Sequence, residues 1–199
     1  MVNGSSARTV LDSAWLRGLP SLTGAPPIFD IDDVPDDPLT LFAHWFAEAV
    51  RDDVPEPRAM TLSTLGQDGM PDARVLILKG VSVDGWAFAG PRSSAKAAQL
   101  ATHPAAALSF WWQPQMRALR LRGQVHEASA ADSAADLAQR PAAARDDIDP
   151  DDWVLWRLMP EQIEFWQGAT DRRHLRLIYR RQGGAWVHAR HGAVEEDRA

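Results

Sequence analysis

The segment Glu161–Gly168 reads EQIEFWQG, and a cluster of Arg172, Arg173 and His174 follows it. An apolar strand therefore ends on a Trp and leads into a group of cations. Trp offers a flat face and an N–H donor, Arg presents a planar fork to phosphate oxygens, and His exchanges a proton near neutral pH. The pattern favours a site for a planar aromatic ring that carries a phosphate. These residues alone also fit a strand with a buried Trp and a solvated basic turn.

A second segment has the pattern of a β-hairpin whose apolar second strand carries a cation at each end. Its first strand is RAMTLSTL at Arg58–Leu65, its turn begins with GQDG at Gly66–Gly69, and its second strand is PDARVLILKG at Pro71–Gly80. A Gly-rich turn between two such runs is typical of a hairpin. The cations at the ends of the second strand are Arg74 and Lys79.

Taken together, these segments resemble the pyridoxine (pyridoxamine) 5′-phosphate oxidase family. The family pattern is an R-x-x-L-L-K strand, a later S-x-K turn, and Q-I-E-F-W-Q-G followed by R-L-H. Besides the segment quoted first, the matching positions begin at Arg74, Ser94 and Arg172. The resemblance extends over residues 37–186. It implies a mainly β (α+β) fold, namely a split β-barrel with flanking helices that binds FMN across a homodimer interface.

Length and composition fit one domain preceded by an arm. The chain has 199 residues, enough for a sizeable core. Residues 1–35 are rich in Pro, Gly and Ser, and we predict a mobile arm that wraps a partner subunit. Residues 36–199 are predicted to form a single FMN-binding split-barrel domain. Within it, Asp37 is expected to cap a helix that begins at Pro38 and buries one apolar stripe.

Short strands are predicted after this helix. Strands are expected around Thr61, Leu76, Trp86–Ala89, Ala107–Trp112, Arg117–Gly123, Leu155, Ile163, Leu177 and Trp186, and helices over Pro91–His103 and from Ser129. Many short strands with few helices are typical of a β-barrel with flanking helices.

Composition and missing motifs argue against several classes of function. The net charge of −6 argues against a general nucleic-acid binder. No long apolar window or signal-peptide pattern is present, so we expect a cytoplasmic protein without membrane contact. The chain has no Cys and hence no disulfide, thiolate metal site or Cys nucleophile. Asp147, Asp149 and Asp151 mimic a Ca²⁺ loop but lack its Gly and Glu, so a solvated acidic linker and no metal site are predicted.

The resemblance implies one set of residues for the flavin and another for the substrate. The cofactor-binding residues are Arg74, Val75, Leu76, Ile77, Leu78, Lys79, Ser94, Lys96, Trp166 and Arg176. The substrate-binding residues are Lys79, Arg140, Arg172 and His174, with Arg172 and His174 as the catalytic pair. Ser94 and Lys96 match the phosphate-binding turn, and a phosphate requires cations and N–H donors. Without the resemblance, Lys79 and Lys96 would be interpreted as surface cations.

The activity that the resemblance implies is that of an FMN-dependent oxidoreductase. It would oxidise a phosphorylated pyridine or a similar small heteroaromatic compound, with dioxygen as the acceptor, while the protein positions the substrate. The chain is divergent, since Ala95, Ala118 and Asp136 stand where the family has Arg, Gln and Tyr, and the segment after Arg140 is shortened. These departures favour the alternative of a non-catalytic relative that binds flavin, haem or pyridoxal phosphate. The retained catalytic pair favours the enzyme.

Overall fold

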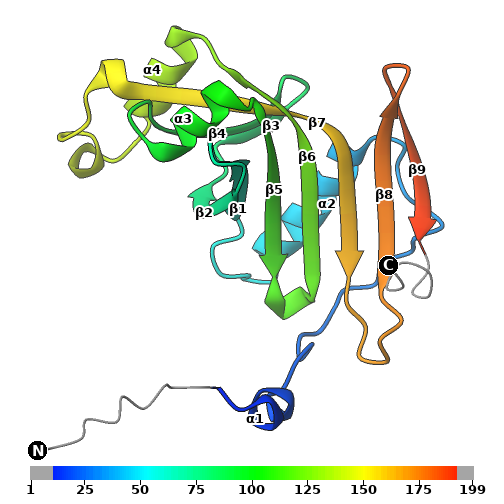
Figure 1. Cartoon of the computed structure of the whole chain (residues 1–199). Coiled ribbons are helices and arrows are strands. Elements are labelled where there is room, and N and C mark those ends of the chain that lie inside the picture. The colour runs from blue at the N-terminus through cyan, green and yellow to red at the C-terminus, as the bar shows by residue number, and fades with distance from the viewer. Residues whose placement is uncertain (1–10, 192–199) are drawn as a thin grey trace, which may run out of the picture.

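The computed structural model describes residues 11–191. In this part of the chain, nine strands form one curled antiparallel sheet with helices around it (Figure 1). The strand order is β2-β1-β5-β6-β7-β4-β3, and β8 and β9 extend the sheet from β7. This architecture confirms the predicted mainly β fold with flanking helices. None of the helices described is long and apolar enough to cross a membrane.

The elements have the following bounds. The strands are β1 (Ala59–Leu65), β2 (Pro71–Ile77), β3 (Gly80–Ser82), β4 (Gly85–Pro91), β5 (Ala105–Trp112), β6 (Arg117–Glu127), β7 (Trp153–Gln167), β8 (Leu175–Gln182) and β9 (Ala185–His191). The α-helices are α1 (Ser13–Gly18), α2 (Pro38–Arg51), α3 (Ala95–Thr102) and α4 (Ala130–Ala138), and short 3-10 turns cover Gln113–Gln115, Ala142–Ala144 and Pro150–Asp152.

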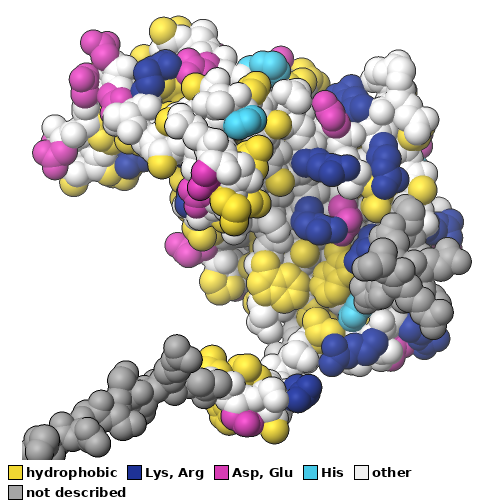
Figure 2. Space-filling view, viewed as in Figure 1, with side chains coloured by type: hydrophobic (Ala, Val, Ile, Leu, Met, Phe, Trp, Pro, Cys, Tyr) yellow, Lys and Arg dark blue, Asp and Glu magenta, His cyan; other side chains and the backbone are white. Residues whose placement is uncertain are grey.

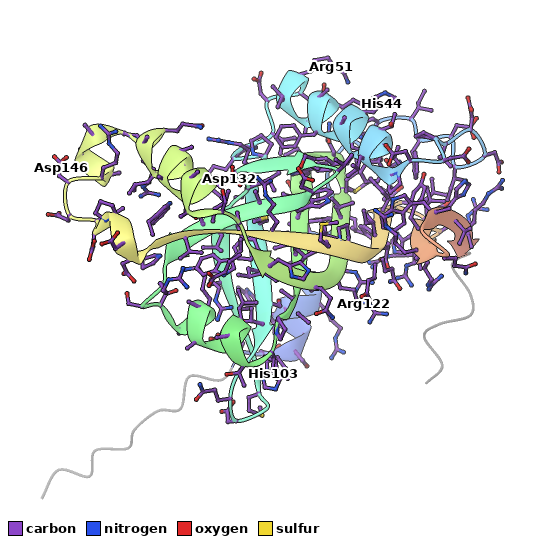
Figure 3. All side chains as sticks on the ribbon, turned by 90° about the horizontal axis from the view of Figure 1, so that it is seen from above. His44, Arg51, His103, Arg122, Asp132 and Asp146 are labelled. Atoms are coloured by element: carbon purple, nitrogen blue, oxygen red, sulfur yellow. The ribbon has the colours of Figure 1, made fainter. Side chains whose placement is uncertain are left out.

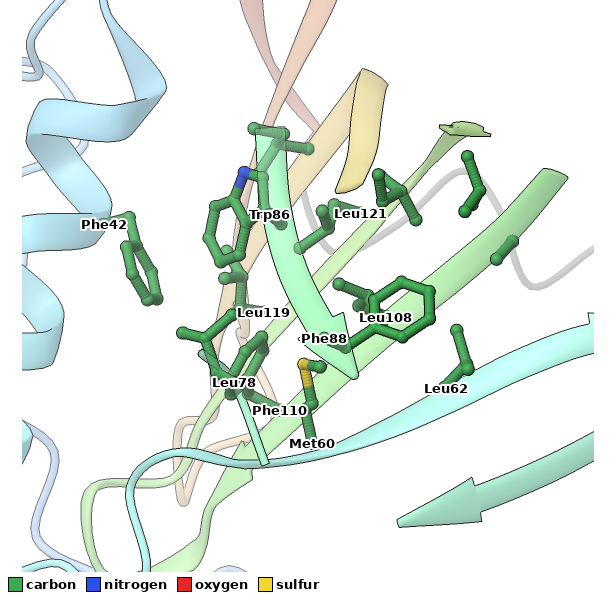
Figure 4. Close-up of a cluster of buried hydrophobic side chains, with 14 of the residues drawn as sticks. Phe42, Met60, Leu62, Leu78, Trp86, Phe88, Leu108, Phe110, Leu119 and Leu121 are labelled. Carbon is green, nitrogen blue, oxygen red and sulfur yellow. The ribbon is translucent and has the colours of Figure 1, made fainter. Parts of the chain in front are cut away.

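Helix α2 packs on one face of the sheet and completes the core. Asp37 is its N-cap and Pro38 its first residue, as the capping rules predict. The ring centroids of Phe42 on α2 and Trp86 on β4 lie 4.3 Å apart, and both side chains are buried. Figure 4 shows these two rings beside the buried side chains of β1, β4, β5 and β6. Burial of such large aromatic side chains dominates the stability of a core.

The segment predicted to be an arm is partly attached to the barrel of its own chain. Residues 1–10 lie outside the described residues. Helix α1 stands away from the sheet (Figure 1) and has no buried residue. Farther along, the Ala25 N–H donates to Pro114 O at 2.8 Å, and the Tyr179 hydroxyl donates to Pro35 O at 2.7 Å. The chain is therefore bound to the sheet before α2 begins.

Strand β7 joins two regions that the sequence predicts as separate strands around Leu155 and Ile163. It is 15 residues long although Pro160 lies inside it. Its register with β6 shifts just before Gly123, which pairs with Pro160. A Cβ on Gly123 would overlap Met159 O, so glycine is required at this bulge. The bulge lets the strand continue past a residue that cannot donate to the ladder.

The single Tyr of the chain makes stability sensitive to alkaline pH. Burial, and then the charges of Asp36 and Asp37, raise the pKa of Tyr179 to about 12. Above about pH 10 the unfolded chain loses this proton while the folded chain keeps it, so the free energy of unfolding should fall as pH rises from about 10 to about 12. Tyr179→Phe should remove this pH-dependent fall. It should also lower the free energy of unfolding by about 1 kcal/mol at neutral pH, because the hydrogen bond of the hydroxyl is lost. Urea unfolding of both proteins checks this, and parallel pH profiles would contradict it.

Candidate functional site

The predicted phosphate-binding turn lies between β4 and α3. Asp152 holds this turn, because its carboxylate accepts from the Ser93 N–H at 2.7 Å and from the Ser93 hydroxyl at 2.6 Å. Ser94 is the N-cap of α3, but its hydroxyl donates to Pro91 O at 2.6 Å and makes no capping bond to the helix. The helix therefore begins at Ala95, later than predicted. Asp152 directly follows the acidic residues predicted to form a solvated linker, and it has a structural role in the turn.

Lys96 is the buried cation of this turn. Its ammonium donates to Ser94 Oγ at 2.9 Å and lies 5.4 Å from the centroid of the Trp156 ring. The residue is 7% exposed, so it is not a surface lysine. Burial, and then the charge of Arg74, lower the pKa of Lys96, because both disfavour its cationic form. A Cβ at position 90 would collide with Lys96 Nζ, so Gly90 leaves room for this ammonium.

Arg74 lies on β2 in a hydrogen-bond network that reaches α3. Its guanidinium donates to Thr64 Oγ1, to Gln99 Oε1 at 2.9 Å and to Asp72 Oδ2 at 2.5 Å. Gln99 also donates to Asp72 Oδ2 at 2.9 Å. Sequence reasoning did not single out Thr64, although the predicted hairpin places β1 beside β2. It could not find Gln99, because only the folded chain brings α3 to β2. The network ties β2 to α3, the helix that carries Lys96, and the charge of Arg74 acts on Lys96, so the two cations share one corner of the molecule.

An apolar strand edge and a cavity adjoin this corner. Val75 and Ile77 on β2 are 68% and 39% exposed, whereas Leu78 is buried in the core and Leu76 packs against it. The adjoining cavity has a volume of about 420 Å³ and is lined by Arg58, Val75, Leu76, Ile77, Lys79, Ala89, Gln139, Arg140 and Pro141. Apolar walls with a few polar groups are typical of a small-molecule site.

The structure brings together Lys79 and Arg140, two cations predicted to bind the substrate. Both line the cavity. Lys79 Nζ lies 3.5 Å from Asp136 Oδ1 on α4, and the Arg140 guanidinium lies 4.7 Å from the centroid of the Trp153 ring. Trp153 Nε1 donates to Asp136 Oδ2 at 2.9 Å. Asp136 and Trp153 therefore connect the two cations, although no sequence pattern indicates that Trp153 belongs to this site.

The remaining predicted residues lie near the other end of β7. The ring centroids of Trp166 and His174 are 4.8 Å apart. His174 Nδ1 accepts from the Ala169 N–H at 3.0 Å, so the neutral ring carries its proton on Nε2. Arg172 is exposed, with a left-handed φ of 66°. The predicted catalytic pair thus lies in the loop between β7 and β8, beside Trp166.

The outer face of β5–β8 carries this second group of residues. The register aligns Trp111, Ala118, Trp166 and Arg176 in one row across the four strands. In the next row Arg120 donates to both oxygens of Glu164, at 2.8 and 2.7 Å, and Arg176 Nε lies 3.7 Å from the same carboxylate. Figure 2 shows this face, with large apolar side chains below a group of basic ones. A flat aromatic surface next to paired charges is suited to contact with a ring or with another protein surface.

The two groups of site residues are far apart within one chain. Trp153 begins β7 and Trp166 lies near its end, and a strand of 15 residues has a contour length of about 50 Å. Figure 3 shows β7 crossing the molecule from the side of α4, where Asp132 and Asp146 are labelled, to the side of β8. One chain therefore does not bring Lys96 and His174 to the same ligand.

Comparisons with known proteins define the family. The model of the pyridoxamine 5′-phosphate oxidase family matches residues 46–167, and that of the pyridoxine 5′-phosphate oxidase C-terminal dimerisation region matches residues 153–191. The pyridoxine/pyridoxamine 5′-phosphate oxidase of Thermosynechococcus vestitus is 38% identical over 189 residues, covering 79% of this chain and 90% of that protein. That of Pseudomonas syringae pv. tomato is 37% identical over 190 residues, covering 78% and 88%. The chain belongs to the pyridoxamine 5′-phosphate oxidase family, as its motifs predict.

Solved structures agree on the fold. PhzG from Burkholderia lata 383, solved in complex with tetrahydrophenazine-1-carboxylic acid, has a TM-score of 0.78 and 24% identity, covering 85% of this chain and 100% of that chain. A pyridoxamine 5′-phosphate oxidase-related, FMN-binding protein from Nostoc punctiforme has a TM-score of 0.61 and 21% identity, covering 78% and 97%. These likenesses confirm the predicted split barrel.

Proposed function

We propose that the protein is an FMN-dependent oxidoreductase that oxidises a phosphorylated pyridine or a similar small heteroaromatic compound, with dioxygen as the acceptor. The observation that carries this proposal is the buried ammonium of Lys96 beside Arg74 and the exposed apolar edge of β2. Such a corner fits a cofactor in which a phosphate is attached to a flat ring. The relatives that are about 37% identical, and that are named as oxidases, support the same class of reaction.

Each group of residues has a distinct role in this proposal. Ser94, Lys96 and Arg74 hold the phosphate of FMN, residues 75–79 lie along its ring, and Trp166 and Arg176 approach it from another copy of the chain. When bound, FMN would accept a hydride from the substrate. Lys79 and Arg140 hold the anionic end of the substrate. Arg172 and His174 clamp the substrate over the ring, with His174 Nε2 as a donor because Nδ1 already accepts from the backbone.

A homodimer completes each site in this proposal. The two groups of residues lie at opposite ends of β7, so the second group must come from a partner. The match to the C-terminal dimerisation region covers β7, which carries Trp166, the following loop with the predicted catalytic pair, and β8 and β9. The protein is therefore expected to bind two FMN per dimer, with both chains contributing to each site.

The mass in solution tests this assembly. At micromolar concentration with FMN present, light scattering after size exclusion should give twice the 22.0 kDa of one chain. The absorption of the eluting peak should correspond to one flavin per chain. A peak with the mass of a single chain that still carries flavin would contradict the shared site.

The absorption spectrum of the purified protein, before and after addition of FMN, tests the proposed function. A flavin spectrum that is retained on gel filtration supports the cofactor. Anaerobic reduction of the bound flavin by a small heteroaromatic donor then supports the activity, and we expect pyridoxamine 5′-phosphate to reduce it slowly. A protein that retains no flavin at micromolar FMN would overturn the proposal.

A non-catalytic flavin-binding relative is the second candidate. The observation that favours it is the ion pair of Lys79 with Asp136, which engages one of the substrate cations. The same experiment separates the two candidates, because a binding protein would retain flavin that no heteroaromatic donor reduces.

A further inference from the structure

A buried arginine lies beside the end of the strand that leads into the predicted catalytic loop. Arg117, the first residue of β6, is 1% exposed. Burying a charge costs free energy unless it is paired and hydrogen-bonded. The guanidinium donates to Glu48 Oε2 on α2 at 2.5 Å and lies 4.1 Å from the centroid of the Trp45 ring. Its Nε donates to Gln167 Oε1 at 2.8 Å, so one planar cation connects α2 to the last residue of β7.

Both ends of the Gln167 side-chain amide are engaged in this buried position. The residue is 6% exposed. Its Oε1 accepts from Arg117, and its Nε2 donates to Pro27 O at 3.0 Å. A guanidinium can only donate and a backbone carbonyl can only accept, so the amide has a single orientation that satisfies both partners. Arg117 therefore fixes the side chain with which β7 ends.

The loop of residues 168–174 begins directly at this fixed point. Its first N–H, that of Gly168, donates to Met116 O at 2.8 Å. Its second N–H, that of Ala169, donates to His174 Nδ1 at 3.0 Å. A few consecutive residues of the chain therefore lead from the buried guanidinium to the imidazole. A shift at the end of β7 would displace this ring, because the N–H that orients it would move with the strand.

We propose that Arg117 is a positioning residue of the candidate active site, and that through Gln167 it fixes the loop that carries Arg172 and His174. This inference rests on the proposed function, because that function gives the loop its role. Arg117 is buried within its own chain, so it acts through the loop and not by contact with the substrate. Its replacement should lower the rate of flavin reduction much more than the affinity for FMN.

The imidazole of His174 reports the position of the loop in the absence of any ligand. In the parent, the Ala169 N–H should hold this ring in the tautomer protonated on Nε2. Long-range proton–nitrogen NMR correlation spectra of the flavin-free protein distinguish the two tautomers, and His174→Ala identifies the signal. Arg117→Lys keeps a cation for Glu48 but removes the Nε–H donor, so it should give a mixture of tautomers. If Arg117 only stabilised the fold, the folded variant would keep the signal of the parent.

Gln167→Met breaks the same contact from its other side and should also give mixed tautomers. In the FMN-loaded protein, Arg117→Lys and Gln167→Met should each slow the anaerobic reduction of flavin by pyridoxamine 5′-phosphate about tenfold, because small misplacements of a positioning group are costly in rate. The double variant should be no slower than Gln167→Met, because substitutions that remove one shared contact are not additive. Fully additive losses would overturn the inference.

Gln115→Met is the matched control in the same buried region. Gln115 lies two residues before Arg117 and is 2% exposed, and its amide donates to Asp52 Oδ2 at 2.8 Å. This variant should keep the His174 signal and the reduction rate of the parent. Changes in it as large as those in Arg117→Lys would overturn the inference, as would a parental His174 signal in both Arg117→Lys and Gln167→Met. A loaded parent that no heteroaromatic donor reduces would instead overturn the proposed function, while the His174 tautomer would still test the positioning.

Discussion

Replacing Lys96 with Ala is expected to weaken FMN binding by about 10- to 100-fold. The Lys96 ammonium is buried beside Arg74, and its pKa is lowered because burial disfavours its charge. A phosphate in this corner would stabilise the cationic form of Lys96, because it would place negative charge beside the ammonium. A hydrogen bond to a charged group contributes about 1.5–3 kcal/mol, which corresponds to the expected loss of affinity. Titration of FMN by quenching of its fluorescence measures the effect.

Two controls separate lost binding from lost folding. Lys79→Ala should weaken FMN binding less, because Lys79 is paired with Asp136 at the candidate substrate cavity. The flavin-free Lys96→Ala protein should be about as stable as the parent, because the substitution removes a buried cation that makes no salt bridge within residues 11–191. Equal dissociation constants for FMN in the parent and both variants would refute the assignment of Lys96 to the phosphate.

Replacing Arg172 or His174 with Ala is expected to lower kcat/KM by about 100-fold while the affinity for FMN changes little. Both residues lie in the loop between β7 and β8, and His174 is oriented by the Ala169 N–H and by the Trp166 ring. Misplacement of a substrate by about 1 Å costs about 100-fold in rate, and loss of a group that positions the substrate appears in kcat/KM. Anaerobic single-turnover reduction of the flavin isolates this step.

Arg173→Ala is the matched control for this loop. Arg173 is the neighbour of both residues, but its side chain is 83% exposed and pairs with Asp171 at 2.8 Å. Its removal should leave the rate of flavin reduction nearly unchanged. If all three Ala variants slowed reduction equally, the loop would matter only through its overall conformation, and the assignment of the catalytic pair would be wrong.

The parts of the fold that follow from local chemistry were predictable from the sequence. Asp37 and Pro38 begin α2 where the capping rules place it. The first hairpin pairs β1 with β2 as its pattern predicts. The continuity of β7 was not predictable, because Pro160 normally argues against a strand interior, and only the bulge opposite Gly123 accommodates it.

The candidate site was predictable only as far as its motifs extend. The Ser94 turn and Lys96 match the family pattern, and the fold places Lys96 in a buried position consistent with its predicted role. The partners of Arg74 and Lys79 were not predictable, because Gln99 and Asp136 come from helices distant in sequence. No local pattern signals such contacts, which depend on how α3 and α4 pack against the sheet. Leu78, predicted along the flavin, has its side chain in the core, so only its backbone is available to a ligand.

The length of β7 has a genetic consequence. If each site takes Lys96 from one subunit and His174 from the other, a gene damaged at one of these positions can compensate for a gene damaged at the other. A mixed dimer of the two defective subunits contains one site with both lesions and one with neither. Two inactive alleles expressed together would then restore part of the activity, because the strand separates the two groups of residues by most of its 15 residues.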